Sequence, residues 1–85
     1  MKSLIATNQT IDLKGATSII IGEKEKGLCY TLVPIAIKFE GGKTKHHSIL
    51  FKVKHSQYVN YMLSELEEYS KENRGGSFLI KAEVL

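Results

Sequence analysis

The sequence predicts an α+β fold of two layers, in which one helix packs on one face of a mixed or antiparallel sheet of four or five strands. Three observations support this prediction. Residues 28–55 hold two long runs rich in β-branched residues on either side of a glycine pair, and residues 17–22 form a third such run. After residue 55 the apolar period changes from two to 3.6. The expected order is β-β-β-α-β, and residues 1–16 leave room for an extra N-terminal strand.

The two long runs are expected to form a hairpin, in which alternate residues of each strand are apolar and share one buried face. A two-residue loop would spoil the apolar match across the strands, whereas a connection of residues 41–43 places Ile35 opposite Ile49. We therefore predict this odd-length connection, with a glycine at positive φ. The same register gives two further pairs, Val33 with Phe51 and Thr31 with Val53.

The third β-branched run is expected to pair with the first strand of the hairpin through a charged loop of five residues. This loop length sets Ile21 opposite Cys29 and Ile19 opposite Thr31, so both isoleucines join the buried face. Pro34 then falls one residue beyond the end of this pairing, where its missing N–H removes no ladder hydrogen bond.

The segment after residue 55 predicts a helix of about 17 residues, roughly 25 Å long. Its apolar residues recur at helical spacing, namely Val59, Met62, Leu63, Leu66 and Tyr69. Ser56 suits the N-cap position, and the glycines at Gly75 and Gly76 suit the C′ position. Residues 77–85 alternate again. Because the helix runs back along the sheet, this last strand is expected to run parallel to the strand before the helix.

Length and composition indicate one small domain over residues 1–85, since a chain this short buries only about 60–65% of its surface on folding. Of its residues, 42% are hydrophobic and 25% are charged. No apolar run approaches the roughly 20 residues of a membrane span, and residues 1–6 are too short for a signal peptide. The single cysteine, Cys29, excludes an internal disulfide, so the sequence favours a reducing, cytoplasmic setting away from membranes.

The net charge of +3 is unevenly distributed along the chain. Residues 38–55 hold five lysines and three histidines against one glutamate, whereas residues 57–72 hold four glutamates against one lysine. Eleven of the twelve basic residues are lysine. Because bidentate recognition of guanine depends mainly on arginine, this composition disfavours sequence-specific DNA binding.

One helix covers only one face of a sheet, so the opposite, outer face is a candidate binding surface. The expected neighbours on it are Ile20 with Tyr30, Leu32 with Lys52, Tyr30 with Lys54, and Leu50 with Pro34. The candidate binding residues on this face and on the hairpin are Tyr30, Leu32, Lys38, Lys43, Lys45, Lys52 and Lys54. The alternative is that an N-terminal apolar group covers the outer face as ordinary core, namely Leu4, Ile5, Ile11 and Leu13.

No group of residues shows a catalytic, metal or cofactor motif with its usual spacing, so we expect a protein without enzymatic activity or cofactors. His46 and His47 are adjacent in a strand, so their side chains point to opposite faces and cannot easily share one metal ion. The predicted register places His55 across from Cys29. However, no acidic or amide residue is placed to orient the imidazole, as a thiol nucleophile site requires.

These observations predict a small binding protein that docks its basic hairpin and sheet face on an acidic surface of a nucleic acid or a nucleic-acid-handling protein. A composition rich in lysine and isoleucine but poor in arginine is typical of coding sequences poor in G and C. It favours a bacterial or bacteriophage accessory factor that inhibits or regulates a host system, such as defence. The alternative is a structural or sequestering homo-oligomer that self-associates through its exposed sheet face.

Overall fold

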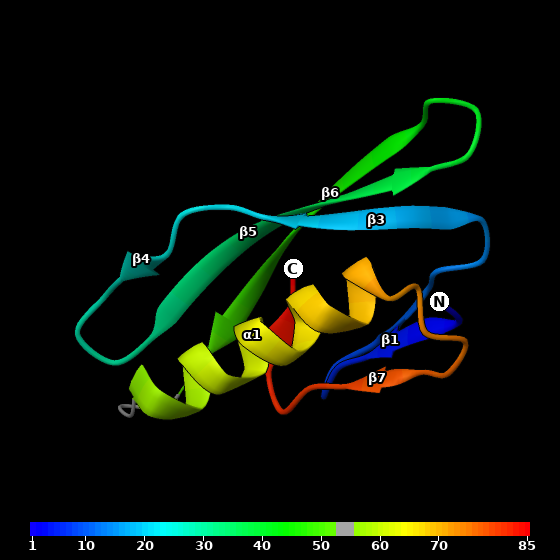
Figure 1. The fold of residues 1–85 in the computed structure, drawn as a ribbon. Helices are drawn as coiled ribbons and strands as arrows, with labels where there is room; N and C mark the ends of the chain where they lie inside the picture. The colour runs from blue at the N-terminus through cyan, green and yellow to red at the C-terminus, as the bar shows by residue number, and fades with distance from the viewer. Residues whose placement is uncertain (53–55) are drawn as a thin grey trace.

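The computed structural model describes residues 1–52 and 56–85, which form two sheets and one helix (Figure 1). In chain order the elements are β1 (Ser3–Ile5), β2 (Thr10–Asp12), β3 (Ala16–Ile21), β4 (Glu25–Lys26), β5 (Thr31–Phe39), β6 (Thr44–Phe51), α1 (Ser56–Lys71), β7 (Phe78–Leu79) and β8 (Glu83–Val84). The larger sheet has the order β3-β5-β6-β8, with β4 also paired to β5, and the smaller sheet has the order β2-β1-β7. The predicted α+β class, with one helix in the C-terminal half, is confirmed.

The connection between β5 and β6 has the predicted three residues but begins one residue earlier. The Phe39 N–H donates to the Lys43 carbonyl at 2.8 Å, so the connection is residues 40–42. Gly41 and Gly42 have φ values of 86° and 89°. The last position of such a connection needs positive φ, which suits Gly42, whereas the predicted connection would have placed Lys43 there.

The strand pairing in this hairpin is therefore shifted by two residues from the prediction. Val33 lies opposite Ile49, and Thr31 lies opposite Phe51. Two predicted pairs are wrong, Ile35 with Ile49 and Val33 with Phe51. Val53, the predicted partner of Thr31, lies outside the described residues. Because the shift is even, each residue keeps its predicted face. The buried apolar residues that the structure describes on this face of the hairpin are Val33, Ile35, Ile37, Ile49 and Phe51.

The third strand, β3, pairs farther along β5 than predicted. Ile21 lies opposite Ile35 and Ile19 opposite Ile37, so the predicted partners of the two isoleucines are wrong. The reason is the short strand β4, which pairs with the first residues of β5 through a tight turn over residues 27–30. The shift is again even, so Ile19 is buried in the core as predicted.

Pro34 lies at the break between β3 and β4. The Gly22 N–H donates to the Pro34 carbonyl at 2.8 Å. The N–H and C=O positions of one strand residue point the same way, so the missing N–H of Pro34 faces this break. Pro34 thus lies just beyond the pair of Ile21 with Ile35, at the opposite end of the pairing from the one predicted.

The helix α1 begins at Ser56, and its apolar face follows the predicted spacing. Val59, Leu66 and Tyr69 are buried, and the other two predicted apolar residues are partly buried against the same core. The predicted glycine at the C′ position is wrong, because Asn73 takes the left-handed conformation there, with φ 47°. The Asn73 and Arg74 N–H groups donate to the last turn of the helix, which closes it as a Schellman motif does.

The C-terminal segment forms two short strands in different sheets in place of the single strand predicted. β7 runs parallel to β1, and β8 runs antiparallel to β6. The chain bends at Lys81 and Ala82 between them. The first strand after the helix, β7, therefore joins β1 in the smaller sheet. The strand that pairs with β6 is β8, and it is antiparallel, so the predicted parallel crossover to the strand before the helix is wrong.

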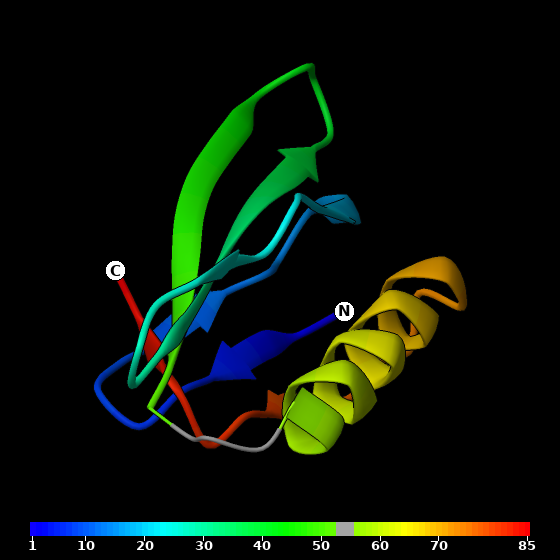
Figure 2. The same ribbon diagram turned by 90° about the vertical axis from the view of Figure 1, so that its left-hand side faces the viewer.

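The N-terminal strands pack on the same side of the larger sheet as the helix (Figure 2). Leu4, Ile11 and Leu13 are buried in one core cluster with Val33 and Ile37. They do not cover the outer face, so the alternative of an N-terminal covering is wrong. In the part of the chain that the structure describes, no helix has the length and apolar character needed to cross a membrane.

Candidate binding surface

Exposed basic side chains surround the connection between β5 and β6, where the hairpin projects past the helix (Figure 1). We call Lys38, Lys43, Lys45 and His46 the hairpin end. All four are exposed, and Glu40 is the one acidic residue in the stretch 38–47. Lys38 lies on the outer face, whereas Lys45, opposite Ile37, lies on the inner face. The hairpin end therefore carries positive charge on both faces.

The lysines of the hairpin end form no ion pair with any residue that the structure describes. The observed ion pairs are Lys52 with Glu83, Lys71 with Glu67, and Arg74 with Glu68 and Glu72. The single arginine, Arg74, is thus paired with Glu68 of the helix and with Glu72 just after it. Its Nε lies 2.6 Å from a Glu72 oxygen, and this hydrogen bond lowers the pKa of Glu72. The hairpin lysines are therefore not paired with a described acidic residue, which leaves them open to an anionic partner.

Lys45 is oriented by an aromatic ring. Its Nζ lies 5.5 Å from the centroid of the Phe39 ring, within the range of a cation–π interaction. Phe39 is half-buried against the edge of the core. The ammonium group therefore has a preferred position on the inner face of the hairpin end.

The outer face carries the predicted apolar residues, but with different neighbours. Leu32 lies opposite Leu50, and Ile20 lies opposite Ala36. The predicted neighbours Ile20 with Tyr30, Leu32 with Lys52, and Leu50 with Pro34 are wrong, for the same shifts in register. Ile20 is 48% exposed, while Leu32 and Leu50 are half-buried.

The structure separates the seven candidate binding residues into groups. Lys38, Lys43 and Lys45 gather at the hairpin end. Tyr30 precedes β5 and is 47% exposed. It lies eight residues from Lys38, or roughly 26 Å along an extended strand. The other three are placed differently: Leu32 is on the outer face, Lys52 is ion-paired with Glu83 at 3.1 Å, and Lys54 is outside the described residues.

Cys29 and the two histidines that the structure describes, His46 and His47, lie on different elements. Cys29 is exposed in the turn before β5, outside the strand pairs that the structure describes in the hairpin. His55, its predicted partner, is outside the described residues. His47 Nδ1 lies 3.3 Å from the Leu85 carbonyl, while His46 is exposed on the other face. Across residues 1–52 and 56–85, no three His, Cys, Asp or Glu side chains gather as a metal site requires.

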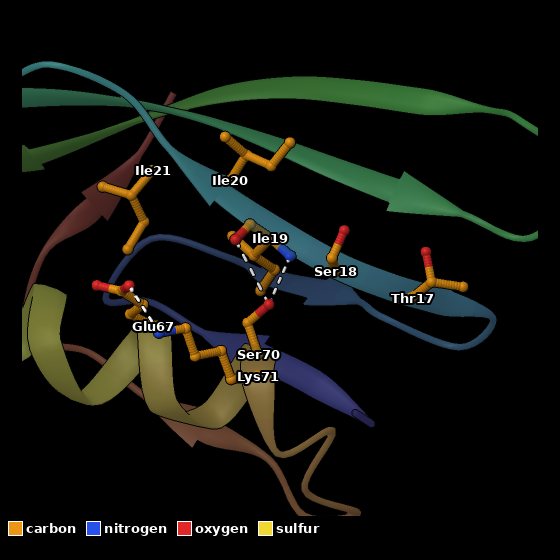
Figure 3. Close-up of a pocket in the computed structure, with 8 residues that line it drawn as sticks. All are labelled: Thr17, Ser18, Ile19, Ile20, Ile21, Glu67, Ser70 and Lys71. Atoms are coloured by element: carbon orange, nitrogen blue, oxygen red, sulfur yellow. Dashed lines mark hydrogen bonds and ion pairs between the residues drawn. The ribbon is translucent and has the colours of Figure 1, made fainter.

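A groove of 480 Å³ between β3 and α1 was not predicted from the sequence (Figure 3). The Ile19 N–H donates to Ser70 Oγ at 2.7 Å, and the Ser70 hydroxyl donates back to the Ile19 carbonyl at 3.4 Å. Lys71 and Glu67 form an ion pair of 3.5 Å on its rim. The signal in the sequence was a serine on the apolar side of the helix. Ser70 is already bonded to Ile19, which holds the helix against β3, and Lys71 is already paired with Glu67.

A second groove, of 410 Å³, lies between the start of α1 and the small sheet. Tyr58 and Met62 line it from the helix, and Ile5 and Leu79 line it from the sheet. Leu79 is 69% exposed. Its lining carries one charged residue, Lys81.

Comparisons of the chain with protein-family models, with curated proteins and with solved structures found no match.

Proposed function

We propose that this protein is a small binding module without enzymatic activity, which docks its hairpin end on an acidic surface of a nucleic acid or a nucleic-acid-handling protein. The observation that carries this proposal is the group of three exposed lysines without ion-pair partners among the described residues. Clustered, unpaired charge speeds association with an oppositely charged partner and selects against partners of like charge.

The composition supports the biological setting that we propose, a cytoplasmic accessory factor of bacterial or bacteriophage origin that inhibits or regulates a host system such as defence. The proposal favours the hairpin end over the outer sheet face. Lys52 of the outer face is already ion-paired with Glu83, and Tyr30 lies far from the lysines of the hairpin end. The working surface is therefore smaller than the one expected from the sequence.

Self-association through the outer face is the second candidate function. Its support is the exposure of Ile20 beside the half-buried pair of Leu32 and Leu50. Light scattering at several protein concentrations separates the two: a stable dimer mass favours self-association, and a monomer mass favours the binding module.

Fluorescence anisotropy with labelled duplex DNA, single-stranded DNA and polyglutamate tests the main proposal. If the three lysines of the hairpin end each contact one phosphate, affinity for the duplex falls about 40-fold between about 50 and 200 mM salt. Polyglutamate binding is expected to weaken with salt as well, because exposed charges are screened over about 8–10 Å. An affinity that does not change with salt, or the absence of binding to all three anions, contradicts the proposal.

A further inference from the structure

The edge of β6 near the hairpin end has no neighbouring strand among the described residues. β8 pairs with only two residues of β6, and Leu85 continues the pairing with backbone hydrogen bonds to Ser48 of 2.8 and 3.4 Å. Backbone groups of successive strand residues point to opposite sides. The N–H and C=O groups of Ser48 point toward β8. His46 and Thr44 lie two and four residues before Ser48, so their N–H and C=O groups point to the same side, out of this open edge.

Polar side chains close three other edges of the two sheets. At β3, the Ser70 hydroxyl accepts from the outward N–H of Ile19. After β7, the Tyr58 hydroxyl accepts from the Lys81 N–H. At β8, the Asn8 amide bonds both the N–H and the carbonyl of Val84. By contrast, no hydrogen bond from a described residue reaches the outward backbone groups of Thr44 or His46. This edge therefore keeps its main-chain donors and acceptors available to an incoming strand.

We propose that this edge takes up an acidic, extended polypeptide segment of a partner protein as an additional strand. The inference rests on the proposed function and names its class of partner. The backbone of Thr44 and His46 would supply main-chain hydrogen bonds, as in other cases of strand addition. Lys43, just before β6, and Lys45 in β6 lie two residues apart and on one face, so they would lie beside acidic residues at alternate positions of the added strand.

The charges argue against two other occupants of the edge. A second copy of β6 would bring the lysines of the two edges together, and like charges across a strand pair are unfavourable. A nucleic acid would neutralise Lys43 and Lys45, but its phosphates offer no donors for the carbonyls of Thr44 and His46. An acidic extended peptide matches both the charge and the main-chain pattern.

Amide hydrogen exchange of the full chain, followed by NMR, tests this inference with a synthetic peptide of alternating glutamate and threonine. In the free protein, the outward amides of Thr44 and His46 are expected to exchange faster than those of Lys45 and His47, which face β5. Saturating acidic peptide is expected to slow exchange at Thr44 and His46 at least tenfold. A peptide of alternating lysine and threonine is expected to leave both rates unchanged.

A matched pair of variants tests the role of the main chain. His46→Pro removes an N–H that points out of the sheet, so the ladder to β5 is kept, and peptide affinity is expected to fall at least tenfold. His46→Ala is the matched control, because it loses the same side chain but keeps the N–H, and it is expected to bind the peptide at least tenfold more tightly than His46→Pro does. Equal affinity of the two variants overturns strand addition.

The exchange measurement also separates this inference from the proposed function, and it needs no variant. If the acidic peptide and oligothymidylate both bind but exchange at Thr44 and His46 is not slowed, the strand addition is wrong and the docking on acidic surfaces stands. If neither of these anions binds, and duplex DNA and polyglutamate do not bind either, both are wrong.

Discussion

The side-chain amide of Asn8 forms two hydrogen bonds with the backbone of Val84, as a neighbouring strand residue would. The Val84 N–H donates to Asn8 Oδ1, and Asn8 Nδ2 donates to the Val84 carbonyl, each at 2.9 Å. The Val84 side chain is fully buried, and Val84 lies opposite Ile49 of β6. One side chain from the N-terminal segment thus closes the edge of the C-terminal strand.

Asn8→Ala is expected to lower the free energy of unfolding by about 1–3 kcal/mol, because each of the two hydrogen bonds contributes about 0.5–1.5 kcal/mol. Urea denaturation followed by circular dichroism measures the change. Gln9→Ala is the control: it removes one donor to the Val84 carbonyl, which Asn8 still serves, so a smaller loss is expected. Unchanged stability of Asn8→Ala contradicts the closure of this edge.

Gly22→Ala is expected to destabilise the protein by about 1–3 kcal/mol, the usual cost of overpacking. A Cβ at this position would lie 2.8 Å from the Pro34 Cγ and 3.1 Å from the Pro34 carbonyl oxygen. Gly75→Ala is the matched control, since a Cβ there meets no atom within 4 Å, and a change within about 0.5 kcal/mol is expected. Equal melting temperatures for the two variants would show that the break between β3 and β4 is placed wrongly.

Phe51→Ala is expected to cost about 3–5 kcal/mol, as emptying a core aromatic site usually does. Phe51 is fully buried, and its ring meets Tyr58 of the helix edge-on at 6.2 Å between centroids. Phe39→Ala removes a half-buried ring of equal size, so a smaller loss is expected. Thermal stability of Phe51→Ala near that of the unchanged protein contradicts the assignment of the buried face.

The faces of the strands could be predicted from the sequence, but their pairing could not. A strand has a period of two, so any even slip keeps every side chain on its face, and the pattern of apolar residues does not distinguish such registers. The observed pairing of the hairpin differs from the predicted one by two residues in this way, because Gly42 adopts the positive φ of the connection more easily than Lys43 would. The pairing of β3 differs from the prediction for another reason. The strand β4 pairs with the first residues of β5, so β3 pairs farther along β5.

Contacts distant in sequence account for the remaining differences. Asn8 lies 76 residues from Val84, and Ser70 lies 51 residues from Ile19, so no local pattern indicates either hydrogen bond. The basic hairpin end could be predicted, because charge along one short stretch stays together when that stretch folds as a hairpin. The distance between Tyr30 and the hairpin end could not be predicted without the length of β5. Tyr30 comes just before the first residue of β5, and Lys38 lies near its last residue.

Changes on the outer face are expected to leave anion binding unaltered. Lys52→Glu removes the ion pair with Glu83 and creates a like-charged neighbour, which is expected to cost about 0–1 kcal/mol of stability at this exposed site. Tyr30→Ala removes a half-exposed ring. Anisotropy with duplex DNA and with polyglutamate measures both variants. Loss of binding in either one, with the fold intact by circular dichroism, would make the outer face the binding site.

The salt dependence of duplex binding in two matched double variants tests the central claim, that the hairpin end is the surface that meets an anionic partner. Lys43→Ala with Lys45→Ala removes two charges from the hairpin end, and Lys26→Ala with Lys81→Ala removes two exposed charges elsewhere, Lys26 lying in β4 at the far end of the sheet (Figure 1). We expect the first pair to reduce the slope of log affinity against log salt by about two and the second to leave it unchanged. Equal slopes for the two double variants would contradict the claim.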